Sequence, residues 1–253
     1  MSDSAFSLAG KRIAVTGANT GIGQGIAISI ARAGGAVVGV GRSSIDDTAA
    51  RISALGGQFE AVKADLADTA AAGPLLDRVW EENGPLDGLV NNAGIIRRAD
   101  AVDLSESDWD DVMDVNLKTA FLLCQSFARR VLANGRRGRI VNIASVLSFQ
   151  GGIRVASYTA SKHGVLGITR LLACEWASKG INVNAIAPGY IETNNTQALR
   201  ADADRSAAIL GRIPAGRWGE PGDIGDAAVF LLAPASSYMH GAVVAVDGGW
   251  LAR

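Results

Sequence analysis

A tyrosine and a lysine four residues apart could carry acid–base chemistry in this chain. The segment Ser157-Tyr158-Thr159-Ala160-Ser161-Lys162 has the pattern of a helix start, and residues four apart on a helix share one face. A free tyrosine is a poor acid or base near neutral pH because its pKa is about 10, and an adjacent ammonium lowers that pKa. We expect Tyr158 and Lys162 to form a general acid–base pair, although taken alone such a pair is more often an ordinary helix face.

A glycine-rich turn between a strand and a helix precedes this pair. Arg12–Thr16 is a short apolar run typical of a buried strand, and a helical pattern follows up to Ala33. Glycines between them allow a tight turn and a close approach of the backbone to a pyrophosphate at the helix N-terminus. The spacing Gly-x-x-x-Gly-x-Gly is one residue longer than the common fingerprint. The turn predicts dinucleotide binding by Gly17, Asn19, Thr20, Gly21, Ile22 and Gly23.

The end of the next strand bears on which dinucleotide binds. Residues 36–41 are expected to form this strand, and an acid at its end would bind the ribose hydroxyls of NAD, whereas an arginine would suit the extra phosphate of NADP. This chain has Arg42 and Ser43 there, with no acid until Asp46. The pattern leans to NADP, but Arg42 could equally stack on the adenine.

Strands and helices alternate along the rest of the chain. This alternation predicts an α/β fold with a doubly wound parallel sheet, helices on both faces and a single domain over residues 1–253. The polar segment 190–216 is interpreted as a lid or substrate lobe. Further strands are expected at 58–63, 86–90, 138–145, 181–187 and 242–246, and further helices at 46–55, 69–82, 105–132, 156–179 and 220–232.

Polar residues lie at the predicted carboxyl ends of strands, where open α/β sheets bind ligands. Asp65, followed by Leu66, could bond an adenine or cap the next helix. The run Asn91-Asn92-Ala93-Gly94 could pack against a cofactor or form an ordinary turn. Asn116 lies between two apolar residues of a long helix and needs a hydrogen-bond partner there. Ser145 ends the fifth strand.

The composition narrows the class of protein. The 253 residues are 48% hydrophobic and 19% charged, enough for one α/β domain with a substantial core. The net charge is −1, so neither nucleic acid nor a membrane surface is an expected partner. Cys124 and Cys174 lie in apolar helical patterns and are expected to be buried free thiols, and no metal site is expected. The polar start and the lack of a membrane-length apolar run predict a soluble cytoplasmic protein.

In order and spacing, these motifs resemble those of the short-chain dehydrogenase/reductases. The matching elements cover nearly the whole chain: the glycine-rich turn, residues 91–94, Asn116, Ser145, Tyr158 with Lys162, and Pro188-Gly189. The resemblance implies a Rossmann-type fold and an NAD(P)-dependent oxidoreductase. It adds Asn92, Ala93, Gly94, Pro188 and Gly189 to the cofactor site, with Ile191 and Thr193 holding the nicotinamide carboxamide.

The same resemblance implies roles for the catalytic residues. Tyr158 moves the proton of the reacting oxygen, and Lys162 lowers the tyrosine pKa and binds the nicotinamide ribose. Ser145 holds the substrate oxygen, and Asn116 keeps a water that links Lys162 to solvent. An alternative of a different class is a redox sensor that binds the dinucleotide without turnover. All four positions are filled, which favours the enzyme.

A narrower resemblance points to family members that act on deoxy sugar acids in uronate breakdown. It rests on residues 93–98, 147–154, 193–197, 213–218 and 246–253. The implied reaction interconverts a diketo deoxy sugar acid and its hydroxy form, usually with NAD. We therefore expect NAD(H), with NADP(H) as the alternative because of Arg42. Reduction of an unsaturated-uronate product of alginate, or of another sugar ketone, is the alternative reaction.

A sugar-acid substrate needs a cation for its carboxylate, and a guanidinium can bind it with two hydrogen bonds. The candidate cations, on predicted loops at the carboxyl ends of strands, are Arg97, Arg98, Arg154 and Arg217. Arg154 is preferred because its loop joins Ser145 and Tyr158, and Gln150 and Asn194 are expected to bond sugar hydroxyls.

The resemblance also implies a homotetramer. In the family, the helix expected at 105–132 and the helix of Tyr158 pair across a two-fold axis. Phe121, Leu172 and Trp176 are the apolar residues expected on the outer faces of these helices, and Gly249-Trp250-Leu251 would pack across a second axis.

Overall fold

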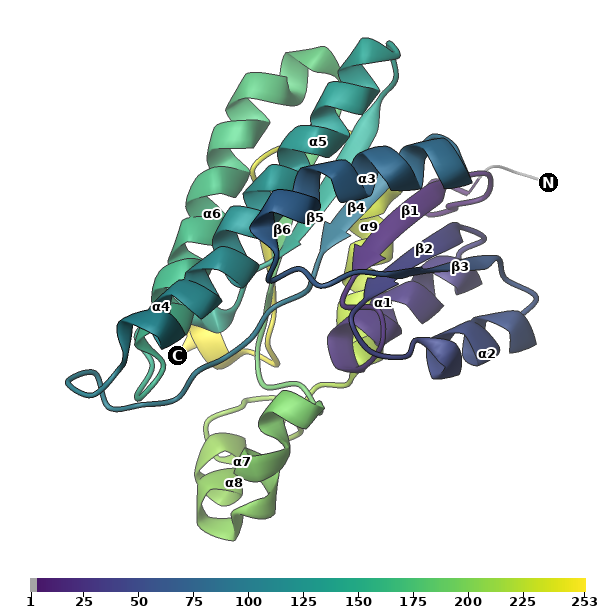
Figure 1. Cartoon of the computed structure of the whole chain (residues 1–253). Coiled ribbons are helices and arrows are strands. Elements are labelled where there is room, and N and C mark those ends of the chain that lie inside the picture. Colours follow the sequence, from purple (N-terminus) through teal and green to yellow (C-terminus); the bar gives the residue numbers. More distant parts are fainter. Residues whose placement is uncertain (1–3) are drawn as a thin grey trace.

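A seven-stranded sheet forms the centre of the computed structural model, which describes residues 4–253 (Figure 1). The strand order is β3-β2-β1-β4-β5-β6-β7, and every neighbouring pair is parallel. The order reverses between β1 and β4, and ligands bind at such a reversal in open α/β sheets. The strands are β1 Arg12–Thr16, β2 Ala36–Gly41, β3 Phe59–Lys63, β4 Gly88–Asn91, β5 Gly138–Ile143, β6 Ile181–Pro188 and β7 Val243–Val246.

Helices cover both faces of the sheet. One apolar cluster joins the sheet to α3, α5 and α6, and a second joins it to α1 and α9 on the other face. Figure 1 shows α5 and α6 side by side, with α1 and α9 on the opposite side. The main helices are α1 Gly21–Arg32, α2 Asp46–Ala54, α3 Thr69–Asn83, α4 Glu106–Met113, α5 Thr119–Ala133, α6 Ala156–Trp176, α7 Gln197–Ala201, α8 Ala203–Leu210 and α9 Pro221–Leu232.

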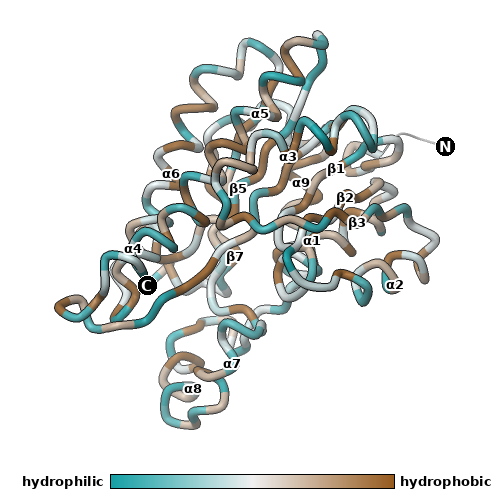
Figure 2. The backbone as a smooth tube through the Cα atoms, viewed as in Figure 1, coloured by the Kyte–Doolittle hydropathy of each residue, from teal (hydrophilic) through white to brown (hydrophobic). Residues whose placement is uncertain are grey.

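The inner strands are buried because both faces of the sheet are covered there, whereas the edge strands β3 and β7 are partly exposed. All eight residues of β6 are buried, and in β1 only the first residue, Arg12, is partly exposed. Continuous apolar runs of this kind are typical of parallel strands between two helical layers. In Figure 2 the hydrophobic colour gathers along the strands and the inner sides of the helices. The expected doubly wound sheet is confirmed, and β1 has the predicted bounds.

None of the helices in residues 4–253 is long and apolar enough to cross a membrane. The helices α7 and α8 project from the body of the molecule below the carboxyl ends of the strands (Figure 1). They lie within the polar segment 190–216, which we refer to as the lid segment.

Two expectations about helix faces are wrong. Leu172 and Trp176 lie in the core, and Phe121 is partly buried against that core, so these three do not form an outer apolar face. Cys124 is buried as expected, but Cys174 is exposed. The helix expected at 105–132 is also not regular, because a π-helical turn at Asp114–Lys118 separates α4 from α5.

Candidate active site

A cavity of about 1100 Å³ opens at the carboxyl ends of the strands. The glycine-rich turn, the ends of β2, β4, β5 and β6, the start of α6 and the lid segment all contribute to its lining. Every residue predicted to bind the cofactor lines this cavity: Gly17, Asn19, Thr20, Gly21, Ile22, Gly23, Arg42, Ser43, Asp65, Leu66, Asn92, Ala93, Gly94, Tyr158, Lys162, Pro188, Gly189, Ile191 and Thr193.

The glycine-rich turn has the geometry that a pyrophosphate requires. Gly17 and Gly21 have φ angles of 66° and 54°, which side chains rarely adopt. A Cβ on Gly23 would lie 2.0 Å from the Gly17 carbonyl oxygen, so the backbone can pack this tightly only without a side chain. No side chain caps the start of α1 within the described chain, and the residues of its first turn line the cavity. An anion can bind there.

Asn92 holds this turn against β4. Its Nδ2 donates to the Thr16 carbonyl oxygen at 2.9 Å, and the Thr16 hydroxyl accepts from the Asn92 and Ala93 backbone N–H groups at 3.0 Å each. Asn92 thus fixes the cradle as well as lining the cavity. These bonds connect the two strands at which the order of the sheet reverses.

The far end of the cavity combines Arg42, Ser43 and Asp65. Arg42 pairs with Asp65 at 4.0 Å, and its side chain is 75% exposed. Asn19 Nδ2 donates to the Ser43 hydroxyl at 2.8 Å. Asp65 accepts from the Ala67 backbone N–H and does not cap the next helix, because Asp68 is the N-cap of α3. An exposed guanidinium beside a hydroxyl can bind an additional phosphate group.

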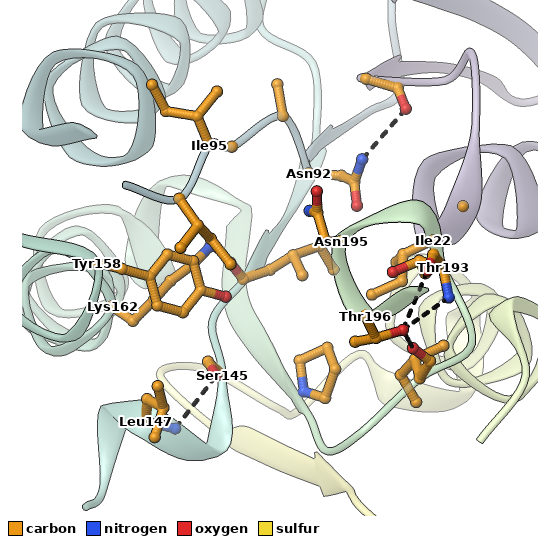
Figure 3. Close-up of a pocket in the computed structure, with 18 of the residues that line it drawn as sticks. Ile22, Asn92, Ile95, Ser145, Leu147, Tyr158, Lys162, Thr193, Asn195 and Thr196 are labelled. Atoms are coloured by element: carbon orange, nitrogen blue, oxygen red, sulfur yellow. Dashed lines mark hydrogen bonds between the residues drawn. The ribbon is translucent and has the colours of Figure 1, made fainter. Parts of the chain in front are cut away.

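Ser145, Tyr158 and Lys162 meet at the centre of the cavity, and Figure 3 shows their side chains around one space. Ser145 follows β5, and its hydroxyl accepts from the Leu147 backbone N–H at 3.1 Å. Tyr158 and Lys162 lie in the first turns of α6, as predicted. Lys162 Nζ donates to the Ile143 carbonyl oxygen at 2.7 Å and lies 5.5 Å from the centre of the Tyr158 ring.

Burial shifts the pKa values of both groups. It raises the pKa of the Tyr158 phenol, while the Ser145 hydroxyl and the positive charge of Arg98 act in the opposite direction. Burial lowers the pKa of the Lys162 ammonium to about 8. Lys162 is not among the groups that shift the Tyr158 pKa, and its ammonium donates to the Ile143 carbonyl oxygen.

Asn116 lies behind the cavity and does not line it. It sits in the π-helical turn and is 2% exposed. Its Oδ1 accepts from the Ile95 backbone N–H at 2.8 Å, and its Nδ2 donates to the Ile95 carbonyl at 3.0 Å and to the Ser161 hydroxyl at 3.2 Å. The expected partners therefore exist, and they connect the loop after β4 to the helix that carries Lys162.

Four of the six residues predicted to contact only the substrate line the cavity: Arg97, Arg98, Gln150 and Asn194. Arg97 forms ion pairs with Asp108 at 3.1 Å and Asp111 at 3.0 Å, so its charge is already balanced. Arg98 donates to the Asn195 carbonyl at 3.3 Å and acts electrostatically on Tyr158.

The other two arginines, Arg217 and the preferred Arg154, do not line the cavity in this structure. Arg154 has a φ of 64° and pairs with Asp100 at 3.3 Å. Arg217 forms two hydrogen bonds to Asp223, at 2.8 and 3.0 Å. Each guanidinium is drawn to an acid outside the cavity.

Two arginines that the sequence reasoning missed, Arg205 and Arg212, line the cavity from the lid segment. The available signal was a pair of arginines seven residues apart in a polar segment that follows a predicted strand end.

Comparisons with known proteins agree with this geometry. The chain matches the family model described as enoyl-(acyl carrier protein) reductase over residues 17–251. It is 57% identical over 250 residues to the 2-dehydro-3-deoxy-D-gluconate 5-dehydrogenase of Escherichia coli (strain K12), covering 99% of each chain. It is 51% identical to the enzyme of that name from Bacillus subtilis (strain 168), covering 98% of each.

Solved structures are similar to this chain over nearly its whole length. A candidate 2-deoxy-D-gluconate 3-dehydrogenase from Agrobacterium tumefaciens, with bound NADP, has 61% identity and a TM-score of 0.95, covering 99% of this chain and 100% of that one. A gluconate 5-dehydrogenase from Burkholderia cenocepacia J2315, in complex with NADP and tartrate, has 37% identity and a TM-score of 0.92, covering 98% of each. The chain belongs to the short-chain dehydrogenase/reductase family and is an NAD(P)-dependent oxidoreductase that acts on CH–OH groups.

Proposed function

We propose that this protein is a 2-dehydro-3-deoxy-D-gluconate 5-dehydrogenase, also named 2-deoxy-D-gluconate 3-dehydrogenase, which works in uronate breakdown from pectin in the cytoplasm. The observation that carries the proposal is one cavity that joins a dinucleotide cradle, a Ser–Tyr–Lys centre and an arginine-rich wall. The cradle and the centre fit hydride transfer to or from a carbonyl, and the arginines fit an acid substrate. The full-length similarity to enzymes of that name supports this substrate.

Each residue of the Ser–Tyr–Lys centre has a separate role in the reaction. A bound nicotinamide dinucleotide supplies or accepts the hydride. In the direction of reduction, Tyr158 gives its phenolic proton to the oxygen of the substrate carbonyl as negative charge develops there, and the Ser145 hydroxyl donates a hydrogen bond to the same oxygen. Burial keeps the Tyr158 phenol protonated, and the Ser145 hydroxyl and the positive charge of Arg98 act in the opposite direction, which favours release of the proton. Lys162 is the group placed to bind the nicotinamide ribose, and Asn116 supports the turn of α6 that carries it.

We infer that the site accepts both NAD(H), the cofactor expected first, and NADP(H). Within residues 4–253, the position after β2 holds Arg42 and Ser43 rather than an acid that would repel the additional phosphate of NADP. The exposed Arg42 side chain is free to turn toward such a phosphate, which gives extra affinity to NADP alone.

We also propose a homotetramer, on the family resemblance. Exposed apolar residues are still present on the two helices that pair in the family, although they are not the predicted ones. Leu132 of α5 and Leu171 of α6 are 38% and 50% exposed.

The test is turnover of the diketo deoxy acid with NADH and with NADPH, followed by absorbance of the reduced nicotinamide. An unsaturated-uronate product of alginate and a neutral ketose serve as competing substrates. Tyr158→Phe should lower kcat by about 100-fold or more, because general acid catalysis is lost, and leave dinucleotide affinity nearly unchanged. A protein that binds the dinucleotide but reduces none of these substrates would be a sensor and not this enzyme.

A further inference from the structure

The lid segment presents two arginines to the cavity that have no acidic partner among residues 4–253. Arg205 lies on α8, and Arg212 follows the end of this helix seven residues later. Neither forms an ion pair within the described chain, whereas Arg97 and Arg42 on other parts of the wall do. The lid segment therefore adds two positive charges that are not neutralised to this part of the wall.

The side chain of Arg212 is held in place by an aromatic cluster. Its guanidinium carbon lies 4.0 Å from the centre of the Trp250 ring. Trp250 is 4% exposed and packs against Tyr190, with ring centres 4.6 Å apart. A guanidinium stacked on an aromatic face keeps its N–H groups in its own plane, parallel to the ring and directed outward. Arg212 can thus offer two parallel donors to a ligand without losing its contact with Trp250.

The charges of Arg205 and Arg212 both act on the side chain of Tyr190. Tyr190 lines the cavity, and the positive charges of Arg212 and Arg205 each lower its pKa, against the effect of burial. The two guanidinium groups are therefore within electrostatic reach of one side chain. Like charges that converge repel one another, and an anion between them would relieve that repulsion.

The other arginines of the wall are less suited to a carboxylate. The charge of Arg97 is balanced by two aspartates. Arg98 acts on Tyr158, so it lies toward the reacting oxygen. In an acid that reacts at carbon 5, the carboxylate is at carbon 1, at the opposite end of the carbon skeleton. The cation that binds it must lie away from Tyr158, which favours the lid segment.

We propose that Arg212, oriented by Trp250 and assisted by Arg205, binds the substrate carboxylate and makes the enzyme selective for sugar acids over neutral ketones. This inference rests on the proposed function for the identity of the acid, but the binding of a carboxylate here can be tested without it.

The first experiment compares Arg212→Gln with wild type on the diketo acid and on a neutral ketose. KM for the acid should rise about tenfold or more, because a charge-assisted double hydrogen bond is lost, and the change for the ketose should be much smaller. Arg212→Lys keeps the charge without the planar fork and should give an intermediate KM. Arg217→Gln, at an arginine that directly follows the lid segment and pairs with Asp223 outside the cavity, is the matched control and should leave both substrates unaffected. An equal change on acid and ketose would overturn the proposal.

The second experiment separates this inference from the proposed function. Tartrate, which a solved relative binds together with NADP, is titrated into the NADP complex of this protein by calorimetry. If the diketo acid is not turned over, the proposed function fails, yet tartrate should still bind wild type about tenfold more tightly than Arg212→Gln. An unchanged Kd, or a wild type that binds no tartrate and shows no preference for acids, would overturn the carboxylate site.

Discussion

Lys162 should destabilise the fold at neutral pH, and replacing it with methionine should raise stability while activity is lost. The lysine is 5% exposed, and burial lowers its pKa from 10.5 to about 8. At about 1.4 kcal/mol per pKa unit, holding the charged form in this place costs about 3 kcal/mol. The sign follows from linkage. The cost is fully present below pH 8, where both states are protonated, and it disappears as pH rises to 10.5 because the native state loses its proton first.

The expected gain is smaller than the full cost. Lys162→Met also removes the hydrogen bond from Nζ to the Ile143 carbonyl, and a buried carbonyl without a partner costs about 1–3 kcal/mol. A net gain of about 0–2 kcal/mol at pH 7 remains, which corresponds to a rise in Tm of at most about 8 °C for a chain of this size. An active site that gives up stability for function in this way is common in enzymes.

Thermal unfolding without added dinucleotide, at one protein concentration and at pH 7 and pH 10, measures this effect. The advantage of Lys162→Met should be largest at pH 7 and should shrink toward pH 10. Lys118→Met is the control, since Lys118 is exposed and pairs with Asp114 on the protein surface. A variant that is less stable than wild type at pH 7, or an advantage that does not change with pH, would refute the reasoning.

Two further predictions concern the cofactor and the assembly. Arg42→Ala should weaken NADP binding about tenfold, through loss of a charge-assisted contact, and change NAD binding little; an equal loss for both in titration calorimetry would instead mean that Arg42 stacks on the adenine. Light scattering at micromolar concentration should give a mass four times that of the 26.1 kDa chain, and a monomer would exclude the tetramer.

The sequence predicts the lining of the cavity well because its signals are local. A strand followed by a polar residue places that residue at the carboxyl edge of a parallel sheet, so residues such as Asp65 and Ser145 converge there without any knowledge of tertiary contacts. The same rule does not bring Arg154 and Arg217 into the lining, because a long side chain on a loop turns toward an acid with which it pairs. Which acid is nearest depends on tertiary structure, and for Arg154 that acid is 54 positions away, at Asp100.

Helix faces were harder to predict than strand ends. In α6, apolar residues occur around most of the circumference, so the side that faces the core cannot be read from periodicity alone. Leu172 faces the core while its neighbour Leu171 is half exposed. The π-helical turn that contains Asn116 also has no sequence pattern from which it could be predicted. The side chain of this asparagine bonds a loop that is 21 residues away, and that contact exists only in the folded chain.

Two neighbouring asparagines show how the site is held together. Asn92 points to one side of β4 and closes the dinucleotide cradle through Thr16. Asn91 points to the other side, where its Nδ2 donates to Asn142 of β5 at 2.9 Å, and Asn142 donates to Thr169 of α6 at 3.0 Å. Hydrogen bonds between buried groups are directional. This series of hydrogen bonds therefore fixes the position of the helix that carries Tyr158 relative to the strand that leads to Ser145. Apolar packing alone would tolerate small shifts between the two, and a proton transfer would not.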